Sequence, residues 1–142
     1  RAPHLRFRRQ RQMCIRDSSD VTVVSFGKIL KEVFIASEKL ESENISLEII
    51  DLRTVRPLDI DTIIASVKKT NRLVILEEAW PFGNVSTEIS YQVQNQALDF
   101  LDAPIIKINT ADTPTPYSPV LLKEWLPNHN DVIKAVNKVL YK

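Results

Sequence analysis

The chain has 142 residues, of which 44% are hydrophobic and 26% are charged, a composition typical of a single soluble globular domain. No apolar run approaches the roughly 18 residues that a membrane span needs, and a single cysteine can form no internal disulfide. Six arginines and one aspartate give residues 1–19 a charge of +5, while 13 basic and 17 acidic residues give the remainder −4. A body of this charge predicts neither a nucleic acid nor a membrane as partner.

The basic tail, residues 1–19, has three interpretations. Its arginines fit a nucleic-acid-binding arm or an organellar transit peptide. The run Gln12-Met-Cys-Ile-Arg-Asp-Ser18, however, resembles the translation of a common sequencing adaptor. We therefore expect residues 1–19 to be non-native or disordered, and we place the domain at residues 20–142.

The domain itself alternates the periodicities of strands and helices. A β-branched run at Val21–Phe26 predicts a buried strand, and apolar residues at spacings of three and four over residues 28–41 predict an amphipathic helix. This cycle recurs, with further strands expected at 47–52, 73–76 and 104–108, further helices at about 59–69, 85–97 and from about 130, and a short segment near 119–126. Such alternation predicts an α/β fold with three layers, helix–sheet–helix, around a mostly parallel sheet.

Candidate catalytic and cofactor-binding motifs are sparse. The turn after the first strand has only Gly27, so no dinucleotide or phosphate loop is predicted. His129 has no nucleophile or orienting acid at a motif spacing, and we interpret it as a surface-loop residue. The sequence also lacks the clustered His, Cys or acidic ligands of a metal site. These residues alone favour a structural or assembly module over a free-standing enzyme.

An acidic pair, Glu77 and Glu78, ends the predicted strand 73–76. Adjacent residues on a strand point to opposite faces, so the two carboxylates should not share a proton. Their expected role is to cap the next helix or to pair with Arg53 or Arg56, although the two arginines could instead bind an anion.

Two aromatic residues, Trp80 and Phe82, follow in the next loop on either side of a proline. Aromatic side chains in such a loop pack an interface or the edge of a core more often than they stack on a cofactor.

Three stretches carry a resemblance to a known family: Asp51-Leu-Arg-Thr-Val-Arg-Pro-Leu-Asp59, Glu77-Glu-Ala-Trp-Pro-Phe-Gly83, and Leu101-Asp-Ala-Pro104 with Ala111-Asp-Thr-Pro-Thr-Pro-Tyr117. Together they resemble the C-terminal domain of the transketolase superfamily, and more closely that domain in the beta subunits of pyruvate dehydrogenases. Asn44, Asn71 and Asn84 stand where glycine is commoner in the family, and asparagine tolerates the left-handed backbone that such turns need.

The resemblance implies a longer parent subunit. Its amino-terminal domain would carry the glutamate that activates thiamine diphosphate, and a separate alpha subunit would hold the diphosphate and magnesium. No catalytic, cofactor-binding or metal-binding residue is therefore expected within this chain, which alone should be inactive.

The partners that the resemblance implies are the alpha subunit, a second beta subunit and the subunit-binding domain of a dihydrolipoyl acyltransferase. The positions that match the acyltransferase surface are Asp102 and the carboxyl end at Lys142. Asp102 is equally well placed to be a turn residue before Pro104.

The expected function is thus assembly and docking within an enzyme that oxidatively decarboxylates pyruvate and passes the acetyl group to lipoyl. Two alternatives stay open. The chain could be the C-terminal domain of another thiamine enzyme, such as a branched-chain 2-oxo acid dehydrogenase or a transketolase, or a free-standing α/β ligand-binding domain. A cytoplasmic location is the default expectation.

Overall fold

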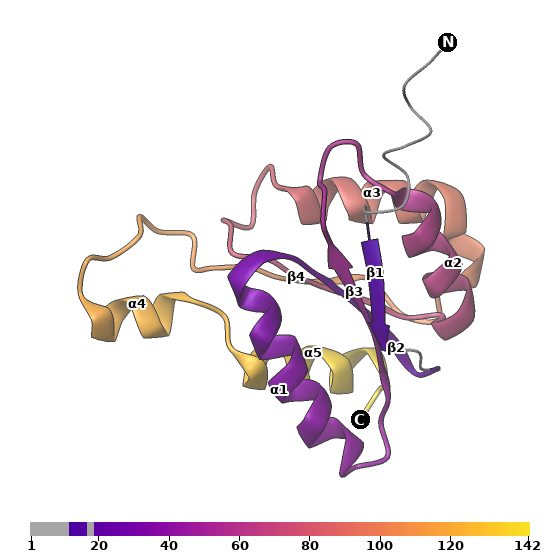
Figure 1. Cartoon of the computed structure of the whole chain (residues 1–142), viewed down its shortest axis with the longest axis horizontal. Coiled ribbons are helices and arrows are strands. Elements are labelled where there is room, and N and C mark those ends of the chain that lie inside the picture. The colour runs from indigo at the N-terminus through magenta and orange to yellow at the C-terminus, as the bar shows by residue number, and fades with distance from the viewer. Residues whose placement is uncertain (1–11, 17–18) are drawn as a thin grey trace.

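A five-stranded sheet lies between two layers of helices in the computed structural model, which describes residues 12–16 and 19–142 (Figure 1). The strands are β1 (Gln12–Arg16), β2 (Val21–Ser25), β3 (Leu47–Leu52), β4 (Leu73–Leu76) and β5 (Ile106–Ile108). They are arranged in the order β1-β3-β2-β4-β5, and β2, β3, β4 and β5 run parallel. The predicted mostly parallel sheet is confirmed.

Helices cover both faces of the sheet. They are α1 (Leu30–Glu41), α2 (Ile60–Thr70), α3 (Val85–Ala97), α4 (Pro119–Trp125) and α5 (His129–Val139), with single 3-10 turns at η3 (Gly27–Ile29) and η4 (Leu98–Phe100). Figure 1 shows α1 and α5 on one face, α2 and α3 on the other, and α4 to one side of the sheet. This arrangement is the three-layer architecture that the sequence predicts. None of the helices in the described part of the chain is long and apolar enough to cross a bilayer.

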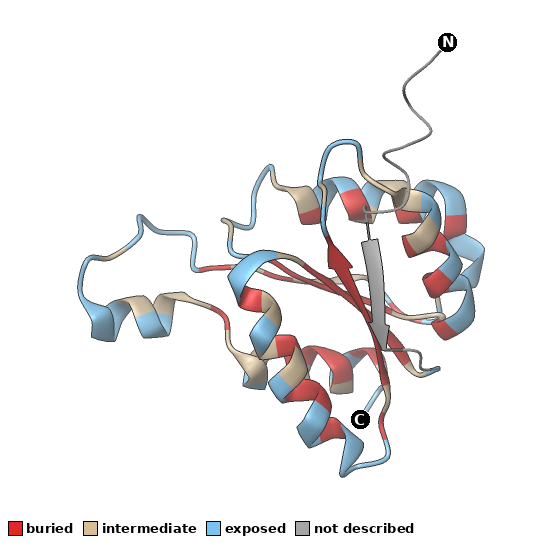
Figure 2. Ribbon diagram, in the orientation of Figure 1, coloured by how far each residue is buried: buried red, intermediate tan, exposed pale blue. Residues whose placement is uncertain are grey.

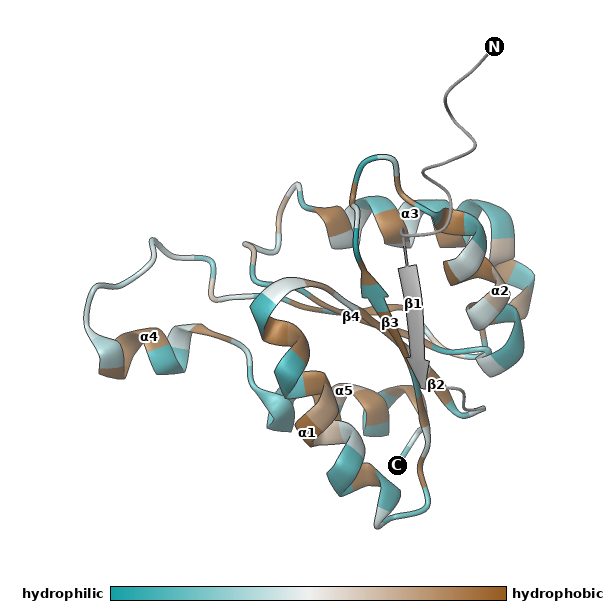
Figure 3. Ribbon diagram, viewed as in Figure 1, coloured by the Kyte–Doolittle hydropathy of each residue, from teal (hydrophilic) through white to brown (hydrophobic). Residues whose placement is uncertain are grey.

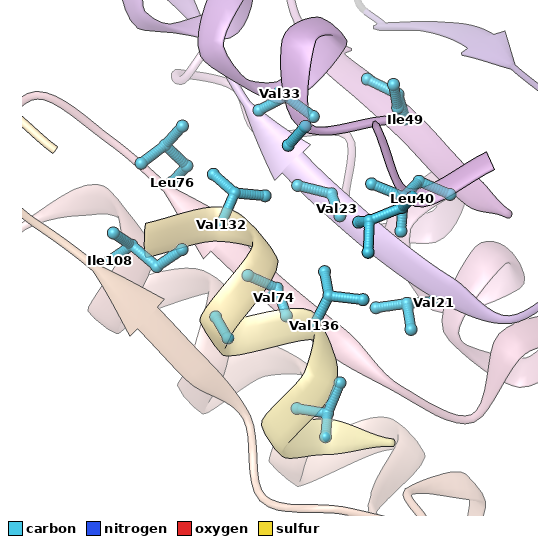
Figure 4. Close-up of a cluster of buried hydrophobic side chains, with 14 of the residues drawn as sticks. Val21, Val23, Val33, Leu40, Ile49, Val74, Leu76, Ile108, Val132 and Val136 are labelled. Atoms are coloured by element: carbon cyan, nitrogen blue, oxygen red, sulfur yellow. The ribbon is translucent and has the colours of Figure 1, made fainter. Parts of the chain in front are cut away.

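Two hydrophobic clusters, one on each face, form the core. Successive residues of a strand point to opposite faces, so Val23 packs against α1 and α5 while Val24 packs against α2 and α3. Figure 4 shows the first cluster, in which Val33 and Leu40 of α1 and Val132 and Val136 of α5 meet the sheet. Because both faces are covered, β2, β3 and β4 are buried along their whole length (Figure 2).

The helices meet the sheet through their apolar sides, which Figure 3 colours brown, while their hydrophilic residues lie on the outer surface. One polar contact interrupts the second cluster. The buried Thr22 hydroxyl of β2 lies 2.7 Å from the hydroxyls of Ser66 and Thr70 on α2. These hydroxyls satisfy one another away from water.

Asparagine ends two helices in the expected left-handed conformation. Asn44 has φ 58° after α1 and Asn71 has φ 60° after α2. Asn84 differs, because its φ of −120° is extended and its side chain caps α3 by accepting a hydrogen bond from the Thr87 N–H at 3.0 Å. Helix capping, and not tolerance of left-handed backbone, therefore explains the asparagine at position 84.

The edge strand β1 falls inside the predicted tail. It pairs antiparallel with β3, with Met13 opposite Asp51. An open sheet edge offers unpaired N–H and C=O groups to any extended segment, so this pairing does not require the segment to be native. Residues 1–11 and 17–18 lie outside the described residues, and the origin of residues 1–19 and the boundary at residue 20 stay predictions.

Candidate docking site

Asp102 lies in the turn that joins η4 to β5, at the amino-terminal end of the parallel strands. Its backbone N–H donates to the carbonyl of Asn71 at 2.9 Å, and the Asn71 side-chain amide donates to the carbonyl of Phe100 at 2.7 Å. Asn71 can make both contacts because its left-handed backbone ends α2 at this point. The turn is therefore fixed by the residue that ends α2, which lies 29 positions before Phe100 in the sequence.

The Asp102 carboxylate points outward from this fixed turn, with 56% of its side chain exposed. One of its oxygens lies 3.5 Å from Nη2 of Arg72, whose side chain is only 25% exposed. The same guanidinium donates from Nε to the carbonyl of Val139 at 3.1 Å. An ion pair this exposed adds little stability, but Arg72 bridges the turn and the end of α5.

The carboxyl end of the chain meets the same turn. The Tyr141 hydroxyl donates to the backbone carbonyl of Asp102 at 2.9 Å, and the Lys142 N–H donates to the carbonyl of Asn137 at 3.0 Å. The structure thus brings together Asp102 and the Lys142 end, the two positions that the family resemblance associates with a partner. It also adds Asn71, Arg72 and Tyr141, whose contribution no local spacing in the sequence could indicate.

Apolar surface surrounds the acidic turn. A hollow of about 590 Å³ opens between α3 and β5, and its lining residues are Ser90, Gln94, Leu98, Leu101, Asp102, Ala103, Pro104, Ile105 and Lys107. Leu98, Phe100 and Tyr141 are exposed nearby. A carboxylate beside exposed apolar side chains suits a protein partner that offers basic groups and some apolar surface.

The carboxylates of Glu77 and Glu78 lie in different environments, one buried and one exposed, as expected for adjacent residues that point in opposite directions. Glu77 is buried, and its carboxylate accepts hydrogen bonds from the Ser86 N–H at 3.2 Å and the Asn109 amide at 3.1 Å. It therefore caps α3, one of the roles expected from the sequence. Glu78 is exposed.

The two arginines after β3 do not pair with these glutamates. Arg53 instead holds Asp51 at the end of the same strand, with Nε 2.8 Å from Oδ2. Arg56 is exposed. The interpretation of both as partners of Glu77 or Glu78 is wrong, because Glu77 faces α3 and its oxygens are used there.

His129 is not the surface-loop residue that the sequence predicts. It is the first residue of α5, and its Nδ1 lies 3.0 Å from Oε2 of Glu32 on α1, which also accepts the His129 backbone N–H at 3.1 Å. Burial raises the pKa of Glu32, but these hydrogen bonds and the charges of Lys31 and His129 outweigh it, and its pKa is lowered overall. An acid does meet this histidine, from a position 97 residues away.

The aromatic loop after β4 contacts the segment between β5 and α4. The indole N–H groups of Trp80 and Trp125 both donate to the carbonyl of Thr113 at 3.0 Å. Phe82 is 92% exposed, which fits the first of the two expected roles, an interface, better than the second, the edge of a core.

A thiamine diphosphate and magnesium site does not fit the residues present. Within the described ranges, no group of three or more His, Cys, Asp or Glu side chains could hold a metal ion. Neither Gly27 nor Gly83 belongs to a glycine-rich phosphate loop.

Comparison with known proteins identifies one family that matches the chain, together with bacterial relatives that share a single name. Residues 12–132 match the family described as transketolase, C-terminal domain. The chain is 50% identical over 127 residues to "Pyruvate dehydrogenase E1 component subunit beta" of Rickettsia felis, covering 89% of this chain and 39% of that protein. It is also 50% identical over 127 residues to the protein of the same name from Rhizobium meliloti, covering 89% of this chain and 28% of that protein.

A solved structure has the same fold. "Split gene transketolase, inactive beta4 tetramer" superimposes with a TM-score of 0.82 at 24% identity, covering 93% of this chain and 43% of that chain. The chain thus spans less than half the length of each of these proteins, and its fold occurs as one part of a longer polypeptide.

Proposed function

Since the chain belongs to the transketolase C-terminal domain family, we propose that it is the assembly and docking domain of the beta subunit of a thiamine-diphosphate-dependent pyruvate dehydrogenase. The identity to two bacterial beta subunits over 89% of the chain supports this assignment. The parent enzyme would decarboxylate pyruvate oxidatively and transfer the acetyl group to lipoyl on the acyltransferase. Its cofactor and its magnesium would be bound by the alpha subunit and by the amino-terminal part of the beta subunit.

Docking of the acyltransferase is the specific role that we assign to the turn at Asp102. The observation that supports it is the exposed carboxylate on a turn fixed by Asn71 and Tyr141. A fixed carboxylate keeps its geometry on binding, so little conformational freedom is lost when basic side chains of the subunit-binding domain pair with it.

The alpha subunit and a second beta subunit would contact other surfaces. The exposed side chains of Trp80, Phe82 and Tyr117 support such contacts, because a lone domain gains nothing by leaving large aromatic groups in water.

Binding of the chain to the subunit-binding domain of dihydrolipoyl acyltransferase tests the docking role. We expect Asp102→Lys to weaken the affinity by about tenfold or more, mainly through a slower association rate, and the loss to shrink at high salt. Surface plasmon resonance at two salt concentrations measures both rates. The matched control is Glu38→Lys on the exposed surface of α1, which changes the net charge equally and should leave the affinity unchanged.

Two outcomes would overturn the docking role. Unchanged affinity of Asp102→Lys would make Asp102 a turn residue only. An equal loss in Glu38→Lys would reduce the effect to overall charge.

A further inference from the structure

A second cavity, of about 440 Å³, opens at the opposite end of the sheet from Asp102. β2 is the first of the parallel strands, and the chain then builds β3 on one side of it and β4 on the other. Lys28 and Ile29 follow the carboxyl end of β2, Glu78 follows that of β4, and all three line the cavity. The cavity therefore lies where the order of the strands reverses, the position at which open α/β sheets bind ligands.

Its walls come from α1, from the segment that runs from α4 to the first residue of α5, and from the turns after β2 and β4. The lining residues are Lys28, Ile29, Lys31, Glu32, Ile35, Glu78, Leu122, Lys123, Leu126, Pro127, Asn128 and His129. Figure 1 shows the connection from α4 to α5 passing beside the start of α1, and the contact between Glu32 and His129 joins these segments. The volume falls within the range of small-molecule sites, roughly 300–1,000 Å³.

The charges in the lining favour an anion. Lys31 lies 3.6 Å from Glu32, which His129 also engages, so this carboxylate is already compensated. Lys28 and Lys123 have no ion-pair partner among the residues that the structure describes, and their ammonium groups are available. Glu78 adds one negative charge to the lining, and its repulsion disfavours a ligand that carries two negative charges.

We propose that this cavity binds a small monocarboxylate with an apolar body. Its carboxylate would lie between Lys28 and Lys123, and its apolar part would lie along Ile35, Leu122 and Leu126. Removal of these side chains and the ligand tail from water would supply most of the affinity, and the lysines would select the charge. This cavity is separate from the turn at Asp102. The proposal therefore holds whether or not the acyltransferase binds at that turn.

Titration of the chain with butanoate, hexanoate and octanoate, followed by amide chemical shifts in NMR spectra, tests the site. We expect saturable shifts confined to residues 27–35, 78 and 122–129, with affinity rising about fourfold for each added methylene. Octylammonium has the same tail and the opposite charge, and it should not bind there.

The charge requirement is tested by Lys28→Glu and Lys123→Glu. Each should weaken octanoate binding about tenfold, and both lysines are exposed, so the fold should persist in the spectrum of the free variant. The matched control is Lys138→Glu, an exposed residue in the last turn of α5, which should bind as the parent chain does. Scattered shifts, equal binding of octylammonium, or an equal loss in Lys138→Glu would each overturn the proposal.

Discussion

Replacement of Glu77 by alanine should destabilise the domain strongly, because the buried carboxylate caps α3. Glu77 is 1% exposed, and its carboxylate accepts the Ser86 N–H at 3.2 Å and the Asn109 amide at 3.1 Å. Ser86 lies in the first turn of α3, where backbone N–H groups have no partner within the helix. Asn84 caps the neighbouring N–H of Thr87, so it cannot replace Glu77.

The expected decrease in the free energy of unfolding follows from these contacts. A buried donor left without an acceptor costs about 1–3 kcal/mol, and loss of a negative charge at a helix N-terminus adds about 0.3–1 kcal/mol. We therefore expect Glu77→Ala to lower the free energy of unfolding by about 3 kcal/mol. Glu77→Gln keeps the shape of the side chain and one acceptor oxygen, so it should lower the free energy of unfolding by about half as much.

Urea denaturation followed by circular dichroism measures these free energies. Glu78→Ala is the matched control, because it removes the same side chain at the next residue, which is exposed, and should change stability by less than about 0.5 kcal/mol. A loss below about 1 kcal/mol in Glu77→Ala, or equal losses in Glu77→Ala and Glu78→Ala, would refute the capping argument.

Three further predictions concern the stability contributed by Glu32, the contact of Arg72 with the carboxyl end, and the activity of the purified chain. Because the pKa of Glu32 is lowered in the fold, its stabilisation is complete above the ordinary value of 4.5 and is lost as the pH falls through the lowered value. Glu32→Gln should therefore be less stable than the parent chain at neutral pH and equally stable in strong acid, and a difference that does not change with pH would contradict this. Arg72→Met removes the donor to Val139, so hydrogen exchange at the amides of residues 140–142 should become faster; unchanged exchange would show that Arg72 does not hold this segment. The purified chain should neither bind thiamine diphosphate with magnesium by calorimetry nor release carbon dioxide from pyruvate, because the proposed function assigns those ligands to other parts of the enzyme; turnover by the chain alone would contradict the assignment.

The layers of the fold were predictable because local patterns determine them. The run at residues 47–52 places apolar residues on both faces, with the β-branched Ile49 and Ile50 at its centre, and it forms β3 with those bounds. The last helix starts one residue earlier than its apolar spacing suggests. Asn128 and Asp131 form a capping box that fixes this start, and such a box can be recognised from sequence.

The contacts between distant residues were not predictable in this way. His129 and Glu32 are 97 positions apart, and Arg72 meets Val139 across 67 positions. No periodicity relates residues at such separations, since they meet only after the helices have packed on the sheet. The turn at Asp102 could be located from the sequence, but the groups that fix it depend on tertiary structure.

The bond from the Tyr141 hydroxyl to the Asp102 carbonyl has a practical consequence for experiments. Residues fused after Lys142 would emerge beside the acidic turn, where they could cover the carboxylate or displace the tyrosine. Affinity tags and surface attachment for binding measurements therefore belong at the amino end.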